Sequence, residues 1–225
     1  MIGATPREDP LTLRVYAVAD IHGRPERFDL IRAKAVETAA DLIVIAGDIS
    51  GFLFHHRIPD QLSNMPVPVF YIRGNSDRKR TAGRLKHIPG ITHLHLKQVP
   101  FRGWRFAGIS GTCLLPFDSR LSFREGRLAE LYNGDWLVGA SVLVAHPPPR
   151  GSLDRVMGRF HAGSKALRAM TLKYQPSVLI CGHIHEDAGA AVLGKTLVVN
   201  CSMAGTGAGV LVDCRAGSPP RATIL

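Results

Sequence analysis

The sequence predicts an α/β fold in which short apolar strands alternate with amphipathic helices. Short runs rich in Val, Ile and Leu recur along the chain, and most end in a glycine or a polar residue. A longer segment between the first two runs repeats its apolar residues at the helical period. With 225 residues and 45% apolar content, the chain can bury a sizeable core. We expect one domain over residues 1–225, with loose tails at about 1–10 and 215–225.

The elements follow from these patterns in chain order. Strands are expected over residues 13–20, 42–48, 69–75, 92–98, 104–111, 141–149, 177–183, 195–200 and 208–214. Helices are expected over residues 26–40, 122–132 and 163–174. The last two strands belong to a closing segment rich in hairpins. The course of loops 51–66 and 113–121 does not follow from the sequence.

Polar side chains that can bind a metal follow almost every expected strand. They are Asp20, His22, Asp48, Asn75, His146, His183 and His185. Ligands of open α/β sheets lie beyond the carboxyl ends of the strands, so these seven side chains are expected to converge there. Carboxylate, imidazole and amide groups without thiolate suit Mn, Fe, Zn, Co or Ni better than calcium. Two such ions about 3.5–4 Å apart would clamp a phosphoryl group and supply hydroxide near neutral pH.

A second His-x-His pair has a different sequence context. His93 and His95 alternate with Leu94 and Leu96, which is typical of a strand with one solvated face, and we assign them no role. The histidines expected on the surface for their polar surroundings are His55, His56 and His87. By contrast, the pair His183 and His185 follows Gly182, which would let the backbone come close to the metal site.

The ordered series D-x-H, G-D, G-N, H and G-H-x-H, over residues 18–186, resembles the calcineurin-like metallophosphoesterase superfamily. Its stretches HPPP, HAGSKALR and ICGHIHE look like small prokaryotic members related to cyclic-nucleotide phosphodiesterases. The resemblance implies a four-layer αββα sandwich with a dinuclear centre at the strand ends. It implies Asp20, His22 and His185 as ligands of one ion, Asn75, His146 and His183 as ligands of the other, and Asp48 as the bridge.

The chain departs from the superfamily pattern directly after Asn75. Many members have a histidine there that binds substrate or protonates the leaving oxygen, whereas this chain has Ser76. Loss of a general acid costs about 10²- to 10⁴-fold on poor leaving groups. His161, beyond the proline-rich loop that follows His146, is a candidate replacement. Asp77 is expected to support Asn75.

The net charge of +10, from 28 Lys and Arg against 18 Asp and Glu, favours an anionic partner. Arg73 and Arg150 are the candidates for gripping phosphate oxygens, because a guanidinium can donate two parallel hydrogen bonds; Ser76 is a further candidate for substrate binding. The expected function is hydrolysis of a small phosphate ester, with diesters such as cyclic nucleotides favoured by analogy. Metal-bound hydroxide would attack in line, with catalytic roles for Asp48, Asn75, His146 and His161.

Two rival functions remain open. The positive charge would also suit a nuclease or a nucleic-acid-binding protein, although only 7% of the chain is aromatic and no binding module is recognisable. A scaffold without catalytic activity is the second rival, and the complete ligand set argues against it. The chain could form homo-oligomers. Widely spaced cysteines and the lack of a long apolar stretch predict a cytoplasmic protein that does not enter a membrane.

Overall fold

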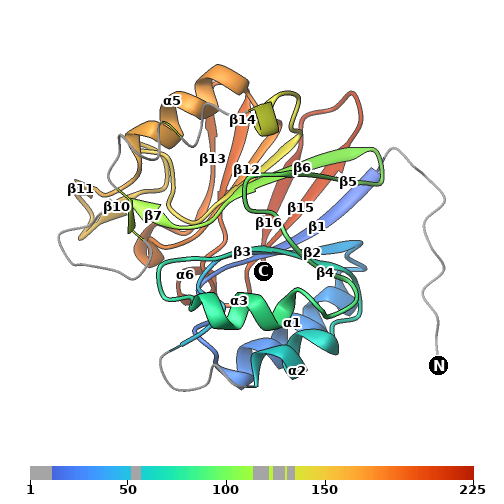
Figure 1. Ribbon diagram of the computed structural model, residues 1–225. Coiled ribbons are helices and arrows are strands. Elements are labelled where there is room, and N and C mark those ends of the chain that lie inside the picture. Colours follow the sequence, from blue (N-terminus) through green and yellow to red (C-terminus); the bar gives the residue numbers. More distant parts are fainter. Residues whose placement is uncertain (1–11, 52–56, 114–121, 124–129, 131–134) are drawn as a thin grey trace.

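The computed structural model describes residues 12–51, 57–113, 122–123, 130 and 135–225, which form two six-stranded sheets packed face to face (Figure 1). The first sheet has the spatial order β16 (Arg221–Ile224), β15 (Val210–Arg215), β1 (Thr12–Val18), β2 (Leu42–Ala46), β3 (Val69–Ile72) and β4 (Ile91–His93). The second has the order β13 (Gly189–Leu193), β14 (Thr196–Asn200), β12 (Val178–Cys181), β9 (Val142–Ala145), β6 (Trp104–Ile109) and β5 (Gln98–Phe101).

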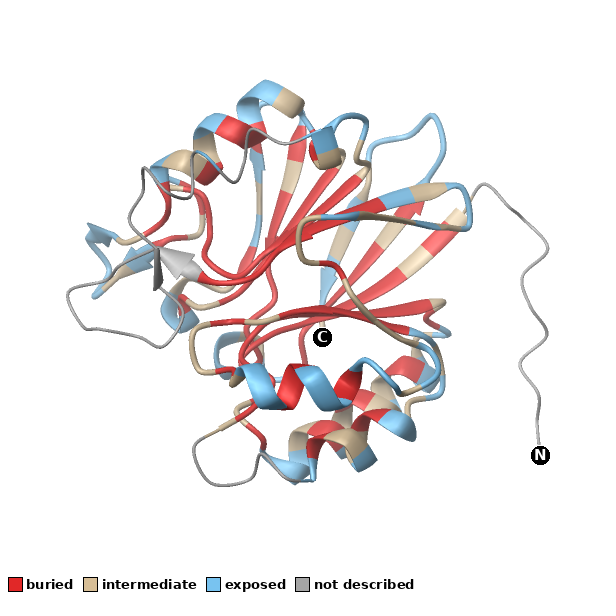
Figure 2. Cartoon of the chain, viewed as in Figure 1, coloured by how far each residue is buried: buried red, intermediate tan, exposed pale blue. Residues whose placement is uncertain are grey.

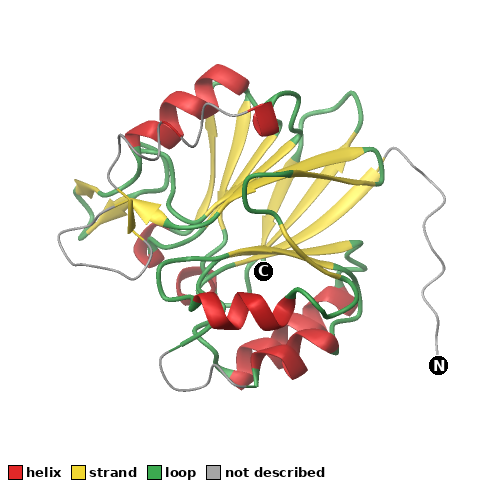
Figure 3. Cartoon of the chain, in the orientation of Figure 1, coloured by secondary structure: helices red, strands yellow, loops and turns green. Residues whose placement is uncertain are grey.

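Helices cover the outer faces of both sheets (Figure 3). The first sheet is covered by α1 (Pro25–Glu37), α2 (Ile58–Ser63) and α3 (Lys79–Leu85), and the second by α5 (Lys165–Tyr174). The short elements are α6 (Met203–Thr206), η1 (Asp135–Leu137), η2 (His185–Asp187), and the strand pairs β7 (Thr112–Cys113) with β8 (Ser122–Phe123) and β10 (Arg155–Val156) with β11 (Phe160–His161). The expected four-layer αββα sandwich is therefore confirmed.

The central strands of each sheet run parallel, which aligns their carboxyl ends. In the first sheet β1, β2, β3 and β4 are parallel, and in the second β6, β9, β12 and β14 are parallel. The flanking strands β15, β16, β5 and β13 run antiparallel to their neighbours. A polar residue just beyond any central strand therefore lies at a common edge of its sheet.

The core has three layers, and Figure 2 shows the central strands buried along most of their length. Val44 and Val144 belong to the layer between the two sheets, Ile43 packs toward α1 and α2, and Leu143 packs with Leu167 of α5. All five side chains are fully buried. Burial on both faces explains why these strands read as continuous apolar runs rather than alternating ones.

Two expectations for the chain were wrong. The tail expected over 215–225 contains β16, which pairs antiparallel with β15 through Val212↔Ala222 and Asp213↔Arg221. The helix expected over 122–132 is wrong at its start, where Ser122 and Phe123 pair with β7, whereas Glu130 is helical as expected. The other residues of this range, 124–129 and 131–132, lie outside the described residues, as do the tail 1–10 and His55 and His56. The undetermined loop 51–66 contains α2.

None of the helices in the described part of the chain is both long and apolar enough to cross a membrane.

Candidate metal centre

Five strands from both sheets bring the predicted ligands to one edge of the sandwich. Asp20 and His22 follow β1, Asp48 follows β2, Asn75 follows β3, His146 follows β9, and His183 and His185 follow β12. One hydrogen bond joins the two sheets there: the amide of His183 donates to Asp20 Oδ2 at 3.0 Å, across 163 positions of sequence. Within the second sheet, the amide of Gly182 donates to the His146 carbonyl at 2.9 Å, which joins the ends of β12 and β9. The predicted convergence is thus present in the structure.

Two groups of three side chains have the geometry of a metal site. Asp20, His22 and His185 each offer a ligand atom, and these atoms all lie within 4.8 Å of one another. The same holds for Asp20, Asp48 and His146. The first group, Asp20, His22 and His185, is the same set of ligands that the family resemblance implies for one ion. The second shares Asp20 with the first, so the two groups adjoin.

Asn75 and His183 lie against the second group. Asn75 Oδ1 is 3.0 Å from His146 Nε2, and Asp48 Oδ1 is 3.5 Å from the same nitrogen. The rings of His146 and His183 meet edge to face with centroids 4.9 Å apart. All the predicted ligands are therefore neighbours, although His183 belongs to neither group of three.

Two buried polar atoms of the site are poorly satisfied by the described chain. His183 Nε2 has no hydrogen-bond partner among the described residues, and Asp20 Oδ1 has only the ion pair with His185 Nε2 at 3.5 Å. Such atoms are rare, because an unpaired buried polar group costs free energy. His146 Nδ1 lies 2.8 Å from the Ala46 carbonyl, which fixes Nδ1 as the donor and leaves Nε2 as a ligand atom. A cation among these oxygens and nitrogens would satisfy the donor set, so the residues fit a metal.

The backbone is strained where it presents the ligands. Asp20, His22, Asp48 and His183 have φ values of 59°, 53°, 52° and 71°, in the left-handed region that residues other than glycine seldom adopt. Each costs on the order of 1–3 kcal/mol and persists only where surrounding contacts impose it. Gly182 allows the close approach expected of it, because a Cβ there would lie 2.4 Å from Ala19 Cβ. Strain concentrated in four of seven ligands is typical of a functional site.

Asp48 is held by the residue that replaces the family's histidine. Ser76 donates to both carboxylate oxygens, from its amide to Oδ1 at 2.8 Å and from its hydroxyl to Oδ2 at 2.9 Å. Asp77 supports the backbone directly before Asn75 rather than the Asn75 side chain. The buried Asp77 carboxylate accepts hydrogen bonds from the amides of Ser50 and Gly74 at 2.8 and 2.9 Å, which ties the loop after β2 to the loop after β3.

We expect Ser76→Ala to weaken metal binding rather than substrate binding. The substitution removes the hydroxyl bond to Asp48 Oδ2 and keeps the amide bond to Oδ1. Loss of such a supporting contact lowers metal affinity by about 10- to 100-fold. Titration of the ion-free protein with Mn²⁺ checks this. An unchanged affinity together with a raised KM would instead assign Ser76 to the substrate.

The charged candidates differ in their surroundings. Arg73 has a buried guanidinium nitrogen, NH1, without a hydrogen-bond partner in the described chain. Arg150 donates from NH1 to the His161 carbonyl at 2.9 Å, so part of its guanidinium holds the adjacent loop. His161 Nδ1 lies 2.6 Å from Asp154 Oδ1.

The prediction that His93 and His95 lie on a solvated strand face was wrong. Both rings are half-buried, and burial lowers the pKa of each, that of His93 to about 4. His93 Nε2 lies 3.0 Å from Ser110 Oγ, and the Ser110 amide donates to His95 Nδ1 at 3.1 Å. His93 also stacks on Tyr71 with ring centroids 4.8 Å apart. The chain crosses from one sheet to the other here, since β4 pairs with β3 whereas His95 bridges to β6. His87 is exposed, as expected.

Sequence reasoning missed Asn200, which positions the segment carrying His185. This side chain is fully buried at the carboxyl end of β14, and Nδ2 donates to the carbonyls of Ile184 and Asp187 at 2.7 and 3.1 Å. The sequence does contain an indication of this role. Asn200 is a polar residue at the end of the run Thr196–Val199, just as each predicted metal ligand follows the end of its strand.

The two carboxylates of the centre control the charge of His146. Burial alone lowers the pKa of His146, but the nearby carboxylates of Asp48 and Asp20 more than offset it and raise that pKa to about 9. Burial also raises the pKa of Asp48 and Asp20, yet charged histidines and hydrogen bonds bring the net pKa of each below its usual value. The ion-free centre is therefore a cluster of paired charges, and a metal must displace the His146 proton.

Metal affinity is expected to rise with pH. Because the pKa of His146 is raised to about 9, the ring is protonated below that pH, and each unit of acidification lowers the affinity by at least about tenfold. The hydrogen bond to Asp20 also raises the pKa of His185, which adds to this dependence at lower pH. Above pH 9 this dependence should end. Calorimetric titration with Mn²⁺ at several pH values measures it, and an affinity that stays constant below pH 9 would contradict the assignment of His146.

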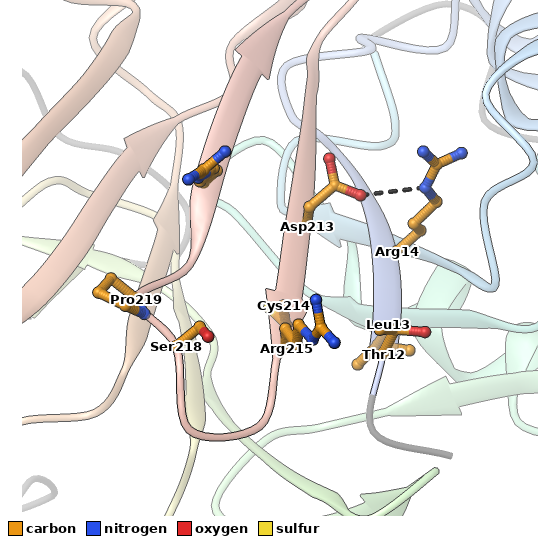
Figure 4. A pocket seen from close by; sticks show the side chains of 9 residues that line it. Thr12, Leu13, Arg14, Asp213, Cys214, Arg215, Ser218 and Pro219 are labelled. Atoms are coloured by element: carbon orange, nitrogen blue, oxygen red, sulfur yellow. Dashed lines mark hydrogen bonds and ion pairs between the residues drawn. The ribbon is translucent and has the colours of Figure 1, made fainter. Parts of the chain in front are cut away.

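A separate cavity of about 510 Å³ lies away from these ligands, along β1, β15 and β16. Figure 4 shows Arg14 paired with Asp213 across neighbouring strands, at 3.0 Å, and Arg215 beside Thr12. Arg221 also lines the cavity. Part of the chain's positive charge is therefore placed away from the candidate metal centre.

Comparisons with known proteins agree with this fold. The profile of the family described as Calcineurin-like phosphoesterase matches residues 13–187. An uncharacterised protein of Methanocaldococcus jannaschii, MJ1162, is 25% identical over 201 residues, covering 84% of this chain and 88% of that protein. The crystal structure of TT1561 of Thermus thermophilus has a TM-score of 0.69 at 18% identity, over 95% of this chain and 99% of that one. A structure described as a novel archaeal phosphodiesterase has a TM-score of 0.56 at 13% identity, over 95% of this chain and 100% of that one.

The profile covers most of the chain, and the candidate ligands lie at the strand ends of the matching fold. The chain therefore belongs to the calcineurin-like phosphoesterase family, whose members use divalent metal ions to hydrolyse phosphate esters.

Proposed function

We propose that the chain is a dinuclear metal-dependent phosphoesterase that prefers phosphodiesters. The observation that carries the proposal is the convergence of seven ligand side chains from five strands, together with the buried His183 Nε2 that has no hydrogen-bond partner among the described residues. Such a set exceeds what one ion needs, since a catalytic ion commonly takes about three protein ligands and keeps a position open.

The ligands divide between two ions. One ion would be held by Asp20, His22 and His185, whose ligand atoms lie within 4.8 Å of one another. The other would be held by Asn75, His146 and His183, which lie side by side. Asp48 would bridge, because its Oδ1 is 3.5 Å from His146 Nε2 and its carboxylate also lies beside Asp20. Mn, Fe, Zn, Co and Ni all suit this mixed oxygen and nitrogen set.

When bound, the two ions would supply hydroxide near neutral pH and neutralise charge on the phosphoryl group. The chain's own residues then orient the ester for in-line displacement. Arg73 lies directly before the ligand loop that follows β3, and its guanidinium would donate to the non-bridging phosphate oxygens. Arg150 uses NH1 to bind the His161 carbonyl, and the other N–H groups of its guanidinium would donate to phosphate oxygens. Ser76 has both polar groups committed to Asp48, so its part is to hold the bridging carboxylate.

The preference for diesters is proposed because this chain resembles known phosphodiesterases. The subfamily that the sequence resembles includes cyclic-nucleotide phosphodiesterases, and a fold relative is described as an archaeal phosphodiesterase. Small nucleotide-type diesters are thus the proposed substrate class. Nucleic acid is the weaker candidate, because the arginines along β1, β15 and β16 lie away from the ligands and do not extend the site into a continuous basic track.

Paired assays test this function. The protein is freed of metal, reloaded with Mn²⁺, and assayed on bis-nitrophenyl phosphate and on nitrophenyl phosphate, which share one leaving group. We expect turnover of both to depend on added metal, with the diester turned over faster. Faster turnover of the monoester would overturn the diester preference. Absence of any turnover in a protein that holds metal would favour a scaffold.

A further inference from the structure

A buried carboxylate holds an exposed histidine on the hairpin formed by β10 and β11. His161 Nδ1 is 2.6 Å from Asp154 Oδ1; the Asp154 side chain is fully buried, whereas 39% of the His161 side chain is exposed. The other carboxylate oxygen of Asp154 accepts from the Gly163 amide at 2.9 Å. An ionised carboxylate only accepts hydrogen bonds, so Nδ1 carries its proton toward Asp154. Nε2 is left for another partner.

The surroundings fix the carboxylate tightly. A Cβ on Gly163 would lie 2.8 Å from both Asp154 Cβ and the Pro148 carbonyl oxygen, so no larger residue fits there. Leu153, directly before Asp154, has a φ of 54°, in the strained left-handed region. Burying a carboxylate to hold one exposed ring is costly in free energy. Buried orienting carboxylates of this kind are typical of histidines that transfer protons.

The hairpin stands at the rim of the metal centre. Its chain leaves β9 through His146, and its base is tied to η2, which begins with His185, by the Arg155 amide donating to Asp187 Oδ2 at 2.8 Å. Asn200 Nδ2 donates to both Leu153 O and Ile184 O, at 3.3 and 2.7 Å, so the residue before Asp154 lies next to the residue between His183 and His185. Figure 1 shows β10 and β11 at the same end of the sheets as α6, which follows β14.

We propose that His161, positioned by Asp154, donates the proton that the leaving oxygen takes during ester hydrolysis. This inference rests on the proposed function. His161 would replace the general acid that the chain lacks after Asn75. Ser76, at that position, donates its hydroxyl hydrogen bond to Asp48. Asp154 acts as a positioning residue, because its side chain is fully buried and contacts His161.

The step balances as follows. The bond between phosphorus and the leaving oxygen breaks while the bond from the attacking hydroxide oxygen forms. The proton on His161 Nε2 moves to the leaving oxygen, which departs as a neutral alcohol. The imidazole, still donating from Nδ1 to Asp154, then takes a proton from solvent, which is equivalent to the one released when water gave hydroxide.

Leaving-group dependence tests the proposal. Diphenyl phosphate and bis-nitrophenyl phosphate have similar shapes, but phenolate is a poor leaving group and nitrophenolate a good one. For His161→Ala, we expect kcat on diphenyl phosphate to fall by about 10²-fold more than kcat on bis-nitrophenyl phosphate. Asp154→Asn should shift the ratio of these rates in the same direction. His87→Ala, which removes an exposed histidine from the polar turn after α3, is the matched control and should keep the wild-type ratio.

A second readout does not depend on activity. In the metal-free protein, ¹⁵N NMR should show the neutral His161 ring protonated on Nδ1, and Asp154→Asn should lose this preference, since an amide can also donate to Nδ1. A His161→Ala ratio within about threefold of the wild-type ratio would overturn the proposal, as would a neutral His161 ring that carries its single proton on Nε2 instead of Nδ1. Wild-type protein that hydrolyses neither substrate would show that the proposed function itself fails.

Discussion

Asp48→Ala is expected to abolish hydrolysis and the binding of at least one ion. Asp48 is 2% exposed and contacts His146, and both of its oxygens are held by Ser76. In the proposed centre it is the one carboxylate shared by both ions, so no neighbouring group can replace it. Two metal ions stabilise the transition state by several kcal/mol. Because each 1.36 kcal/mol is worth tenfold, kcat should fall by about 10³-fold or more.

The measurement for Asp48→Ala is metal content and kcat on the same preparation. Asp29→Ala is the matched control, because Asp29 is an exposed carboxylate on α1 that pairs with Arg32 of the same helix. Exposed pairs of this kind contribute about 0–1 kcal/mol, so the control should fold, bind metal and turn over substrate as the wild type does. An Asp48→Ala protein with full metal content and at least a tenth of wild-type kcat would contradict the bridging role.

Gly74→Ala is expected to damage the centre through a single methyl group. A Cβ at Gly74 would lie 2.1 Å from Asp48 Oδ1 and 2.6 Å from the Asp48 amide nitrogen. The backbone of Gly74 does not have a positive φ, so alanine is excluded by contact rather than by conformation. Asp48 or the loop after β3 must move, and a displacement of about 1 Å in a catalytic site can cost 10²-fold. Metal affinity and kcat should therefore fall together.

Gly83→Ala is the control for this substitution. Gly83 lies within α3, and a Cβ there would meet no atom within 4 Å. Alanine in a helix interior is more stable than glycine by about 0.5–1 kcal/mol, so this variant should melt at a higher temperature and keep its activity. If Gly74→Ala also keeps wild-type metal affinity, the close approach of the two loops is not needed for the centre.

The candidate ligands could be predicted because the parallel strands impose their convergence. Each ligand follows a run such as Leu42–Ala46 or Val178–Cys181, whose burial on both faces makes it easy to recognise. Parallel pairing then places the ends of these runs at one edge, whatever the loops between them do. Asp48 and His183 could thus be assigned to one site without knowing the path of the intervening chain.

Residues whose role depends on loop geometry could not be predicted in the same way. Asp154 precedes His161 by seven positions, in a stretch without helical or strand periodicity, and the two meet only because β10 and β11 pair. The strand β16 was missed because Gly217 and two prolines precede it, a composition that favours a loop. His93 and His95 alternate with leucines, but their outer face is covered where the chain crosses between the sheets.

In the proposed function, two cations bind between the carboxyl ends of the two sheets. A crystal of the Mn²⁺-loaded protein, measured at the manganese absorption edge, tests this most directly. We expect two anomalous peaks about 3.5–4 Å apart, with Asp48 between them. One peak beside Asp20, His22 and His185 and the other beside Asn75, His146 and His183 would complete the assignment. A single peak, or a pair without Asp48 between them, would contradict it.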